Sequence, residues 1–210
     1  MATLKAAAVR AASRGPNDRI RIIPSDLKQK VRERRAGYTI LFVVDASSSM
    51  RGKGRMSHAK ALLHAYLKES YLRRDRVGLV AFHHDRSRLA LPLTPNMRRA
   101  EHVVEQLALG GKTPLAEGIA LGLRALLQER YRNPETDTVM VLVSDGKPNL
   151  SLHGGDPLEE ALMVAERVAQ NRTALVFIDT EDDPLAFGYG PQVARAAGGV
   201  YRTMASLMKD

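Results

Sequence analysis

The sequence of 210 residues contains no cysteine and no tryptophan, and aromatic residues make up only 5% of it. Without cysteine, the chain has no disulfide bonds, no thiolate metal ligands and no cysteine nucleophile. That absence is compatible with a reducing compartment. No apolar run approaches the roughly 20 residues that a membrane-spanning helix needs, so we do not expect a membrane protein. The N-terminus is rich in Ala, Arg and Ser but lacks the apolar core of a secretory signal, which leaves an organelle transit peptide as the alternative.

Positive charge is concentrated at one end of the chain. The formal net charge is +9, and residues 1–37, with ten Lys or Arg and three Asp or Glu, account for +7 of it. Residues 38–210 are therefore nearly balanced. A strongly basic chain can indicate nucleic-acid binding, but here the excess lies in one arm and few aromatic residues are available to stack on bases. The pattern favours an acidic protein partner over nucleic acid.

Apolar runs and amphipathic segments alternate from residue 38 onward. Continuous apolar, β-branched runs predict strands buried on both faces, and apolar residues at helical spacing predict helices. Strands are expected over residues 38–44, 75–82, 87–93, 137–144, 173–180 and 199–204, and helices over residues 55–72, 96–109, 114–131, 157–170 and 189–198. This alternation predicts an α/β, Rossmann-like fold: an open, mostly parallel sheet with one short antiparallel edge strand and helices on both faces.

We expect two parts in the chain. Residues 1–37 form a basic N-terminal extension with one helix, which begins near Ser25 or Asp26 and ends at Gly37. Residues 38–210 form one α/β domain without an internal repeat. In an open parallel sheet, a ligand binds outside the carboxyl ends of the strands, where the winding of the chain changes direction. Residues that directly follow strands are therefore the candidates for a functional site.

Five oxygen-bearing side chains occupy such positions. Asp45, Ser47 and Ser49 form a D-x-S-x-S pattern directly after the first strand, and Asp145 follows the strand at 137–144. Thr113 lies between them in the sequence, in a glycine-rich loop before a helix. An all-oxygen set favours Mg²⁺, with Mn²⁺ or Ca²⁺ as substitutes, over zinc or copper. The alternative is that the hydroxyls only cap helices and that Asp145 only shapes a turn.

The loop around Thr113, with the sequence GGKTPLAEG, contains the Gly-Lys-Thr ending of a nucleotide-binding P-loop. A P-loop also needs a glycine that is separated from the Gly-Lys pair by four residues, and a strand that leads into the loop. Gln106 occupies the position of that glycine, and the preceding segment is predicted to be helical. We therefore expect no ATP site here. The glycines instead allow the backbone to approach a metal closely.

The pattern of D-x-S-x-S, a later Thr and Asp-Gly after an apolar strand resembles the metal-ion-dependent adhesion site of von Willebrand factor A domains, which integrin I domains share. The resemblance covers residues 38–205 and implies the von Willebrand factor A fold. It implies that Asp45, Ser47 and Ser49 are direct or near-direct ligands. It also implies that Thr113 binds directly or through water and that Asp145 acts mainly through water.

Further segments are similar to the C-terminal domain of the magnesium chelatase D subunit and to chelatase-like proteins of cobalt insertion. They are DLKQKVRERRAG before the first strand, RDRVGLVAF, GGKTPLAEGI and VLVSDGKPN. The AAA+-like ATPase module and the acidic, Pro-rich linker of that family have no counterpart here. The sequence is therefore either a C-terminal piece or a small protein that relies on a separate ATPase. Ser48 stands where many relatives have glycine, but this position is not a ligand.

The resemblance implies a non-catalytic, Mg²⁺-dependent interaction component of an ATP-dependent chelatase, which inserts a divalent metal into a tetrapyrrole. The expected partners are an AAA+ ATPase subunit and a large tetrapyrrole-binding subunit, with a partner's Asp or Glu completing the Mg²⁺ shell. The basic helix would attract an acidic partner surface through Lys30, Arg32, Arg34 and Arg35, unless it is simply a solvated helix. The expected location is the cytoplasm, or the plastid stroma in a photosynthetic eukaryote.

Two other functions are alternatives to a chelatase component. The same module could serve an AAA+ ATPase in another metal-cofactor assembly or in a protein-remodelling system. Independent catalysis would need a base or a nucleophile, and His83 and His84 are the candidate bases near the ligand edge. A histidine pair in a loop is more often a partner contact, and we assign it that role. Ser47 lacks the G-x-S-x-G elbow of a hydrolase, so we expect no enzyme activity from this chain alone.

Overall fold

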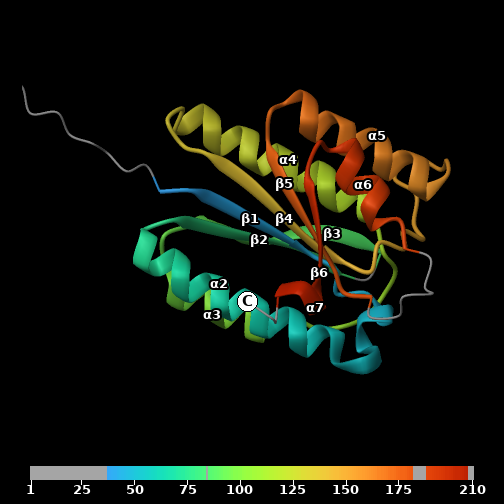
Figure 1. The fold of residues 1–210 in the computed structure, drawn as a ribbon, viewed down its shortest axis with the longest axis horizontal. Coiled ribbons are helices and arrows are strands. Elements are labelled where there is room, and N and C mark those ends of the chain that lie inside the picture. The colour runs from blue at the N-terminus through green and yellow to red at the C-terminus, as the bar shows by residue number, and fades with distance from the viewer. Residues whose placement is uncertain (1–36, 84, 182–187, 208–210) are drawn as a thin grey trace, which may run out of the picture. The chain divides into compact units, whose positions relative to one another are not determined.

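The computed structural model describes residues 37–83, 85–181 and 188–207. Within these residues, six strands form one sheet in the order β3-β2-β1-β4-β5-β6 (Figure 1). The strands are β1 (Thr39–Val44), β2 (Arg76–His83), β3 (Arg86–Thr94), β4 (Thr138–Ser144), β5 (Ala174–Asp179) and β6 (Val200–Thr203). All neighbouring strands pair in parallel except β2 and β3, which form an antiparallel pair at one edge. The predicted fold class is confirmed.

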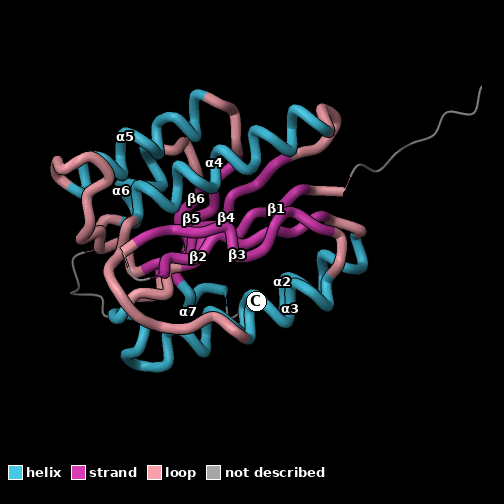
Figure 2. The backbone as a smooth tube through the Cα atoms, turned by 180° about the vertical axis from the view of Figure 1, so that it is seen from behind, coloured by secondary structure: helices cyan, strands magenta, loops and turns pink. Residues whose placement is uncertain are grey.

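Helices cover both faces of this sheet. They are the 3₁₀ helix η2 (Ser48–Gly54) and the α-helices α2 (Arg55–Arg73), α3 (Met97–Glu105), α4 (Leu115–Arg132), α5 (Pro157–Gln170), α6 (Gly190–Ala196) and α7 (Met204–Leu207). Helices α4, α5 and α6 lie on one face, and α2, α3 and α7 lie on the other (Figures 1 and 2). Among the described residues, no helix has both the length and the apolar character that crossing a bilayer requires.

The central strand β1 explains why the sequences of the strands are continuous apolar runs. Its side chains alternate between the two faces, as the pleat requires. Leu41 and Val43 belong to the core cluster under α4, α5 and α6, whereas Phe42 and Val44 belong to the cluster under α2 and α3. Because both faces are covered, apolar residues are needed at successive positions rather than at every second one.

The winding of the chain changes direction between β1 and β4. From β1 the chain continues to β2 on one side, and later returns to place β4 on the other side of β1. The register pairs Val44 with Val143, so the residues that follow the two strands emerge side by side. Asp45 and Asp145 are therefore brought to the same position at the carboxyl edge of the sheet, where open α/β folds bind ligands.

The structure differs from the sequence-based prediction at several boundaries. The helix expected over residues 96–109 ends at Glu105, and Leu107 and Leu109 instead pack in an irregular segment against the core cluster under α2 and α3. Their apolar spacing reflects this packing rather than helix. The short helices η2 and α7 were not predicted, and the antiparallel edge strand β3 has nine residues rather than being short.

Helix α4 packs closely against the sheet at Gly118, where the ring of Phe82 takes the place of a side chain. A Cβ atom at this glycine would lie 2.1 Å from the Cε1 of Phe82, a buried residue of β2. A glycine here removes the side chain that would hold the helix away from the strand. The position of α4 matters because the loop that contains Thr113 leads directly into it.

We predict that Gly118→Ala lowers the free energy of unfolding by about 1–3 kcal/mol, because the new methyl group overpacks the helix against Phe82. Chemical denaturation with urea measures this change. Gly52→Ala is the control, since a Cβ there would meet nothing within 4 Å. The control is expected to stay within about 0.5 kcal/mol of the wild type. Equal stability of the two variants would contradict the close-packing account.

Candidate metal centre

The D-x-S-x-S segment folds into a tight loop that directs its polar groups together. Asp45 follows β1, and its Oδ1 accepts a hydrogen bond of 2.9 Å from the backbone N–H of Ser47. The hydroxyl oxygens of Ser47 and Ser49 lie 2.8 Å apart and share a hydrogen bond. The chain then enters η2 at Ser48. Thus the three residues that the sequence singled out are brought together.

Asp45 is fully buried and is held from both strands. Its Oδ2 accepts a hydrogen bond of 2.7 Å from the Oγ of Ser144, the last residue of β4. That same hydroxyl oxygen accepts a bond of 3.1 Å from the backbone N–H of Gly146. The pKa of Asp45 is raised to about 6, chiefly by burial and also by the nearby charge of Asp145, against the opposing effect of the bonds from Ser47 and Ser144.

Asp145 presents one oxygen to the site. Its Oδ1 accepts a bond of 3.2 Å from the backbone N–H of Lys147, across a turn in which Gly146 has φ +66°. The sharp turn expected from Asp-Gly is therefore present. Its Oδ2 is buried and has no hydrogen-bond partner among the described residues. The cation that approaches it is Arg55, whose Nη1 lies 3.9 Å away, too far for a hydrogen bond.

The loop that carries Thr113 is tied to both neighbouring loops. The backbone N–H of Gly110 donates to the carbonyl of Ala46 at 2.8 Å, and the N–H of Ser48 donates to the carbonyl of Gly111 at 3.1 Å. Gly111 has φ +89°, a conformation that favours glycine. On the other side, the side chain of Asn149 accepts a bond of 2.7 Å from the N–H of Thr113, which is itself buried.

The surroundings of this loop argue against an ATP site. It is preceded by helix α3 and an irregular segment, and α4 begins only at Leu115, after Thr113 and Pro114. A P-loop requires a strand that leads into the loop. Its backbone instead pairs with the segment that follows β1.

The donor set fits a hard divalent cation. It combines two carboxylates and three hydroxyls, all oxygen, with a formal charge of −2. Adjacent oxygens around an octahedral Mg²⁺ ion lie about 3 Å apart when each is roughly 2.1 Å from the metal. The separation of 2.8 Å between the hydroxyls of Ser47 and Ser49 is close to this value. The Oδ2 of Asp145, which has no hydrogen-bond partner among the described residues, is a further candidate donor.

A conventional cluster of acidic or nitrogen ligands is not present. Among the residues that the structure describes, no three His, Cys, Asp or Glu side chains are grouped so that they could hold a metal ion. Only two carboxylates contribute to the predicted set, and the hydroxyls supply the remainder. The site residues therefore stay a prediction, supported by their juxtaposition and by the chemistry of the donors.

Sequence reasoning missed the residues that support the site. Ser144 positions Asp45, Asn149 positions Thr113, and Arg55 approaches Asp145 while it pairs with Glu181. Asn149 follows Asp145 closely in SDGKPN, and this proximity was the available signal. Arg55 and Glu181 carry no such signal, because they are 126 positions apart in the sequence and meet only in the fold.

The other predicted contacts are only partly described. His83 is the last residue of β2, where it pairs with Arg86, rather than a residue of the following loop. Its side chain and all of His84 lie outside the described part of the chain. The same holds for the basic residues Lys30, Arg32, Arg34 and Arg35 of the N-terminal extension. Their proposed role in partner binding stays a prediction.

The sequence model of the von Willebrand factor type A domain matches residues 40–147. The chain belongs to this family. The matched region begins in β1 and ends after Asp145, so it contains all five predicted metal ligands. The predicted family is therefore confirmed.

Related proteins include both uncharacterised members and chelatase subunits. The chain is 32% identical over 209 residues to the uncharacterized protein Rv2850c of Mycobacterium tuberculosis, covering 100% of this chain and 32% of that protein. It is 31% identical over 157 residues to the uncharacterized protein MJ0910 of Methanocaldococcus jannaschii, covering 74% and 90%. It is 36% identical over 165 residues to the magnesium-chelatase 60 kDa subunit of Cereibacter sphaeroides, covering 77% and 29%. The chain thus spans about a third of the length of the first and third relatives.

Solved structures share the fold at low sequence identity. The protein BatB from Bacteroides thetaiotaomicron superposes with a TM-score of 0.64 at 17% identity, covering 82% of this chain and 96% of that one. The manganese-loaded TRAP protein of Plasmodium vivax gives a TM-score of 0.61 at 17% identity, covering 83% and 71%. These likenesses show the von Willebrand factor A fold.

We predict that the metal-free domain loses stability as the pH rises from about 4 to about 6. In this range the folded domain keeps a proton on Asp45, whose pKa is about 6, while the unfolded chain releases it near 3.8. Stability from this proton is therefore complete below pH 3.8 and lost above 6, a loss of about 3 kcal/mol.

Urea denaturation in EDTA at several pH values measures this effect, with Asp45→Asn as the test variant. The variant removes the buried charge, so its unfolding free energy at pH 7 is expected to exceed that of the wild type. Glu101→Gln, a change at an exposed carboxylate of α3, is the control and is expected to follow the wild type. Identical pH profiles for all three proteins would contradict the account.

Proposed function

We propose that this domain is a Mg²⁺-dependent interaction component of an ATP-dependent chelatase-type complex. The observation that carries the proposal is the pair of buried carboxylates, Asp45 and Asp145, at the carboxyl edge of the sheet, with the hydroxyls of Ser47 and Ser49 in the loop that begins at Asp45. Two like charges buried together favour a bound cation. We take Mg²⁺ as the ion, since hard oxygen donors suit it, with Mn²⁺ or Ca²⁺ as substitutes.

The ligand set supports a role in binding another protein. Five protein oxygens, some acting through water, leave part of a six-coordinate shell for an outside ligand. Ser49 is exposed, whereas Asp45 and Thr113 are buried. In this proposal, a carboxylate from a partner completes the shell on the side of the exposed Ser49. When bound, the metal supplies charge neutralisation and a directional bond to that carboxylate.

The chelatase assignment rests on the relatives. Several proteins that match most of this chain are named magnesium-chelatase subunits, including the 67 kDa subunit of Chlorobaculum parvum and the 60 kDa subunit of Cereibacter sphaeroides. Membership of the von Willebrand factor A family together with these relatives supports a chelatase-related role. Because this chain spans only about a third of those subunits, the activity of the complete complex belongs to the proposal.

Within such a complex we assign this domain a non-catalytic role. The five proposed ligands offer oxygen donors for a cation and no nitrogen base or thiol, so binding is the chemistry they suit. ATP hydrolysis would be supplied by an AAA+ ATPase partner, and metal insertion by a large tetrapyrrole-binding subunit. The basic residues of the N-terminal extension would add attraction to an acidic partner surface.

We predict that Asp45→Ala abolishes Mg²⁺-dependent binding to the AAA+ ATPase partner and leaves the fold intact. Loss of a ligand removes the ion that a partner carboxylate needs, so recovery of the partner should fall about tenfold or more. Pull-downs with the purified ATPase subunit in Mg²⁺ and in EDTA measure this, with circular dichroism to check folding. Glu101→Ala, at an exposed carboxylate on α3, is the control. Normal recovery with Asp45→Ala would sink the adhesion-site mechanism.

A second candidate function has one observation in its favour. The relative from Methanocaldococcus jannaschii matches this chain over 90% of its own length, so it consists of little more than this region. That relative suits a free-standing adhesion module that serves an AAA+ ATPase in another assembly system. Proteins retained in Mg²⁺ and released by EDTA distinguish the two, because only the chelatase function predicts a tetrapyrrole-binding subunit among them.

A further inference from the structure

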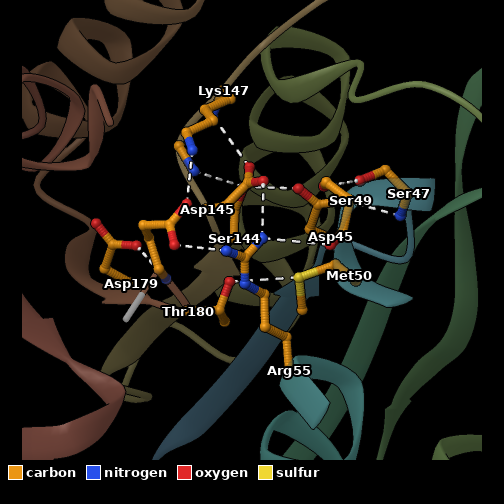
Figure 3. Close-up of polar contacts among 12 residues, drawn as sticks. Asp45, Ser47, Ser49, Met50, Arg55, Ser144, Asp145, Lys147, Asp179 and Thr180 are labelled. Atoms are coloured by element: carbon orange, nitrogen blue, oxygen red, sulfur yellow. Dashed lines mark hydrogen bonds and ion pairs between the residues drawn. The ribbon is translucent and has the colours of Figure 1, made fainter. Parts of the chain in front are cut away.

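One cation of the chain already lies at the proposed metal site. Arg55 is the first residue of α2, and only 12% of its side chain is exposed. Figure 3 shows this side chain pointing toward Asp145, with Asp45 and Ser144 nearby. Its Nη1 donates a bond of 3.3 Å to the carbonyl of Ser49 and lies 3.9 Å from the Oδ2 of Asp145.

The stronger partner of Arg55 is Glu181. The Nη2 of Arg55 lies 2.5 Å from the Oε1 of Glu181, which follows β5 and is 7% exposed. The second oxygen of that carboxylate accepts a bond of 2.6 Å from the Nζ of Lys147. Charges therefore alternate across the carboxyl edge of the sheet, from Asp145 to Arg55 to Glu181 to Lys147. The first contact in this series is the loosest.

Arg55 makes only a loose contact with Asp145 and forms no hydrogen bond with it. The Oδ2 of Asp145 has no hydrogen bond among the described residues, and neither does the buried Nε of Arg55. A fully engaged pair of these groups would form two parallel bonds at about 2.7–2.9 Å. A divalent ion can therefore take the free oxygen of Asp145 while Arg55 keeps its bond to Glu181.

We propose that Arg55 is a tethered cation that competes with the divalent ion for Asp145 and thereby sets the affinity of the site. The proposal rests on the metal-dependent function given above and names a residue that tunes it. Without metal, the guanidinium partly neutralises the buried carboxylates. When metal enters, its charge opposes that of Arg55 across a poorly screened gap, and the side chain withdraws toward Glu181.

The mechanism predicts opposite effects on Mg²⁺ affinity for substitutions at Arg55 and at Glu181. Removing Arg55 takes away the competitor, so the affinity for Mg²⁺ rises. Removing the charge of Glu181 takes away the group that holds Arg55 aside, so Arg55 binds Asp145 more firmly and the affinity for Mg²⁺ falls. Lysine at position 55 keeps the charge but lacks the planar fork that reaches two partners at once. It is expected to give an intermediate affinity.

Isothermal titration with Mg²⁺ alone tests the proposal on the full chain. Arg55→Gln is expected to lower the Kd about tenfold, and Glu181→Gln to raise it by a similar factor. The matched control is Arg51→Gln, which removes an equal charge from η2. Arg51 is exposed and donates to the carbonyl of Leu109 rather than to a carboxylate of the site. Its Kd is expected to stay within about twofold of the wild type.

A second readout follows the side chain itself and does not depend on the stability of a variant. In wild-type protein, the NMR resonance of the Arg55 Nε–H is expected to shift during Mg²⁺ titration, with the same Kd as the calorimetric value. Asp45→Ala should show neither heat nor shift. Equal effects of Arg55→Gln and Arg51→Gln, or an unmoved resonance while Mg²⁺ binds, would overturn the competition and leave the metal site standing. Mg²⁺ binding that survives Asp45→Ala would overturn the metal site and the competition together.

Discussion

The structure depends on the parallel pairing of β1 with β4. Their register places Val44 beside Val143, and a carboxylate follows each strand within two residues. The ends of these strands are buried under helices on both faces, so Asp45 and Asp145 are held close together with almost no exposure to water. Burial removes hydration from these carboxylates, and this loss, together with the nearby charge of Asp145, raises the pKa of Asp45. Burying these two carboxylates together therefore favours a positive charge beside them, at the carboxyl edge of the sheet.

Two kinds of contact stabilise the buried carboxylates: hydrogen bonds and a nearby cation. Hydrogen bonds from Ser47 and Ser144 satisfy Asp45, and they fix its orientation before any ion arrives. Positive charge comes next, from Arg55 at the start of α2. Because η2 links the D-x-S-x-S loop to α2, three of the five proposed ligands, Asp45, Ser47 and Ser49, belong to the same continuous segment as Arg55. The proposed competition would therefore act through a short stretch of chain that joins these ligands to Arg55.

The sequence predicts the parts of this arrangement that are local. Apolar runs place the strands, and the switch in winding then places Asp45 and Asp145 at one edge. The supporting contacts depend on tertiary geometry: Arg55 and Glu181 are 126 residues apart, and neither has a pattern around it. The end of α3 was missed for a related reason, since Leu107 and Leu109 continue the apolar spacing while packing outside a helix. Local periodicity cannot separate packing in a loop from packing on a helix.

In the proposed function, the five protein ligands leave part of the metal shell for a partner. The proposed ligands come from three separate segments: the loop after β1, the loop before α4 and the turn after β4. These segments are tied by backbone bonds between Gly110 and Ala46, and between Asn149 and Thr113. In the proposed function, a partner carboxylate that completes the metal shell would engage all three segments at once, and α4 follows one of them directly. In the proposed function, binding at this edge of the sheet would act directly on α2, through η2, and on α4, two helices that lie on opposite faces of the sheet (Figure 1).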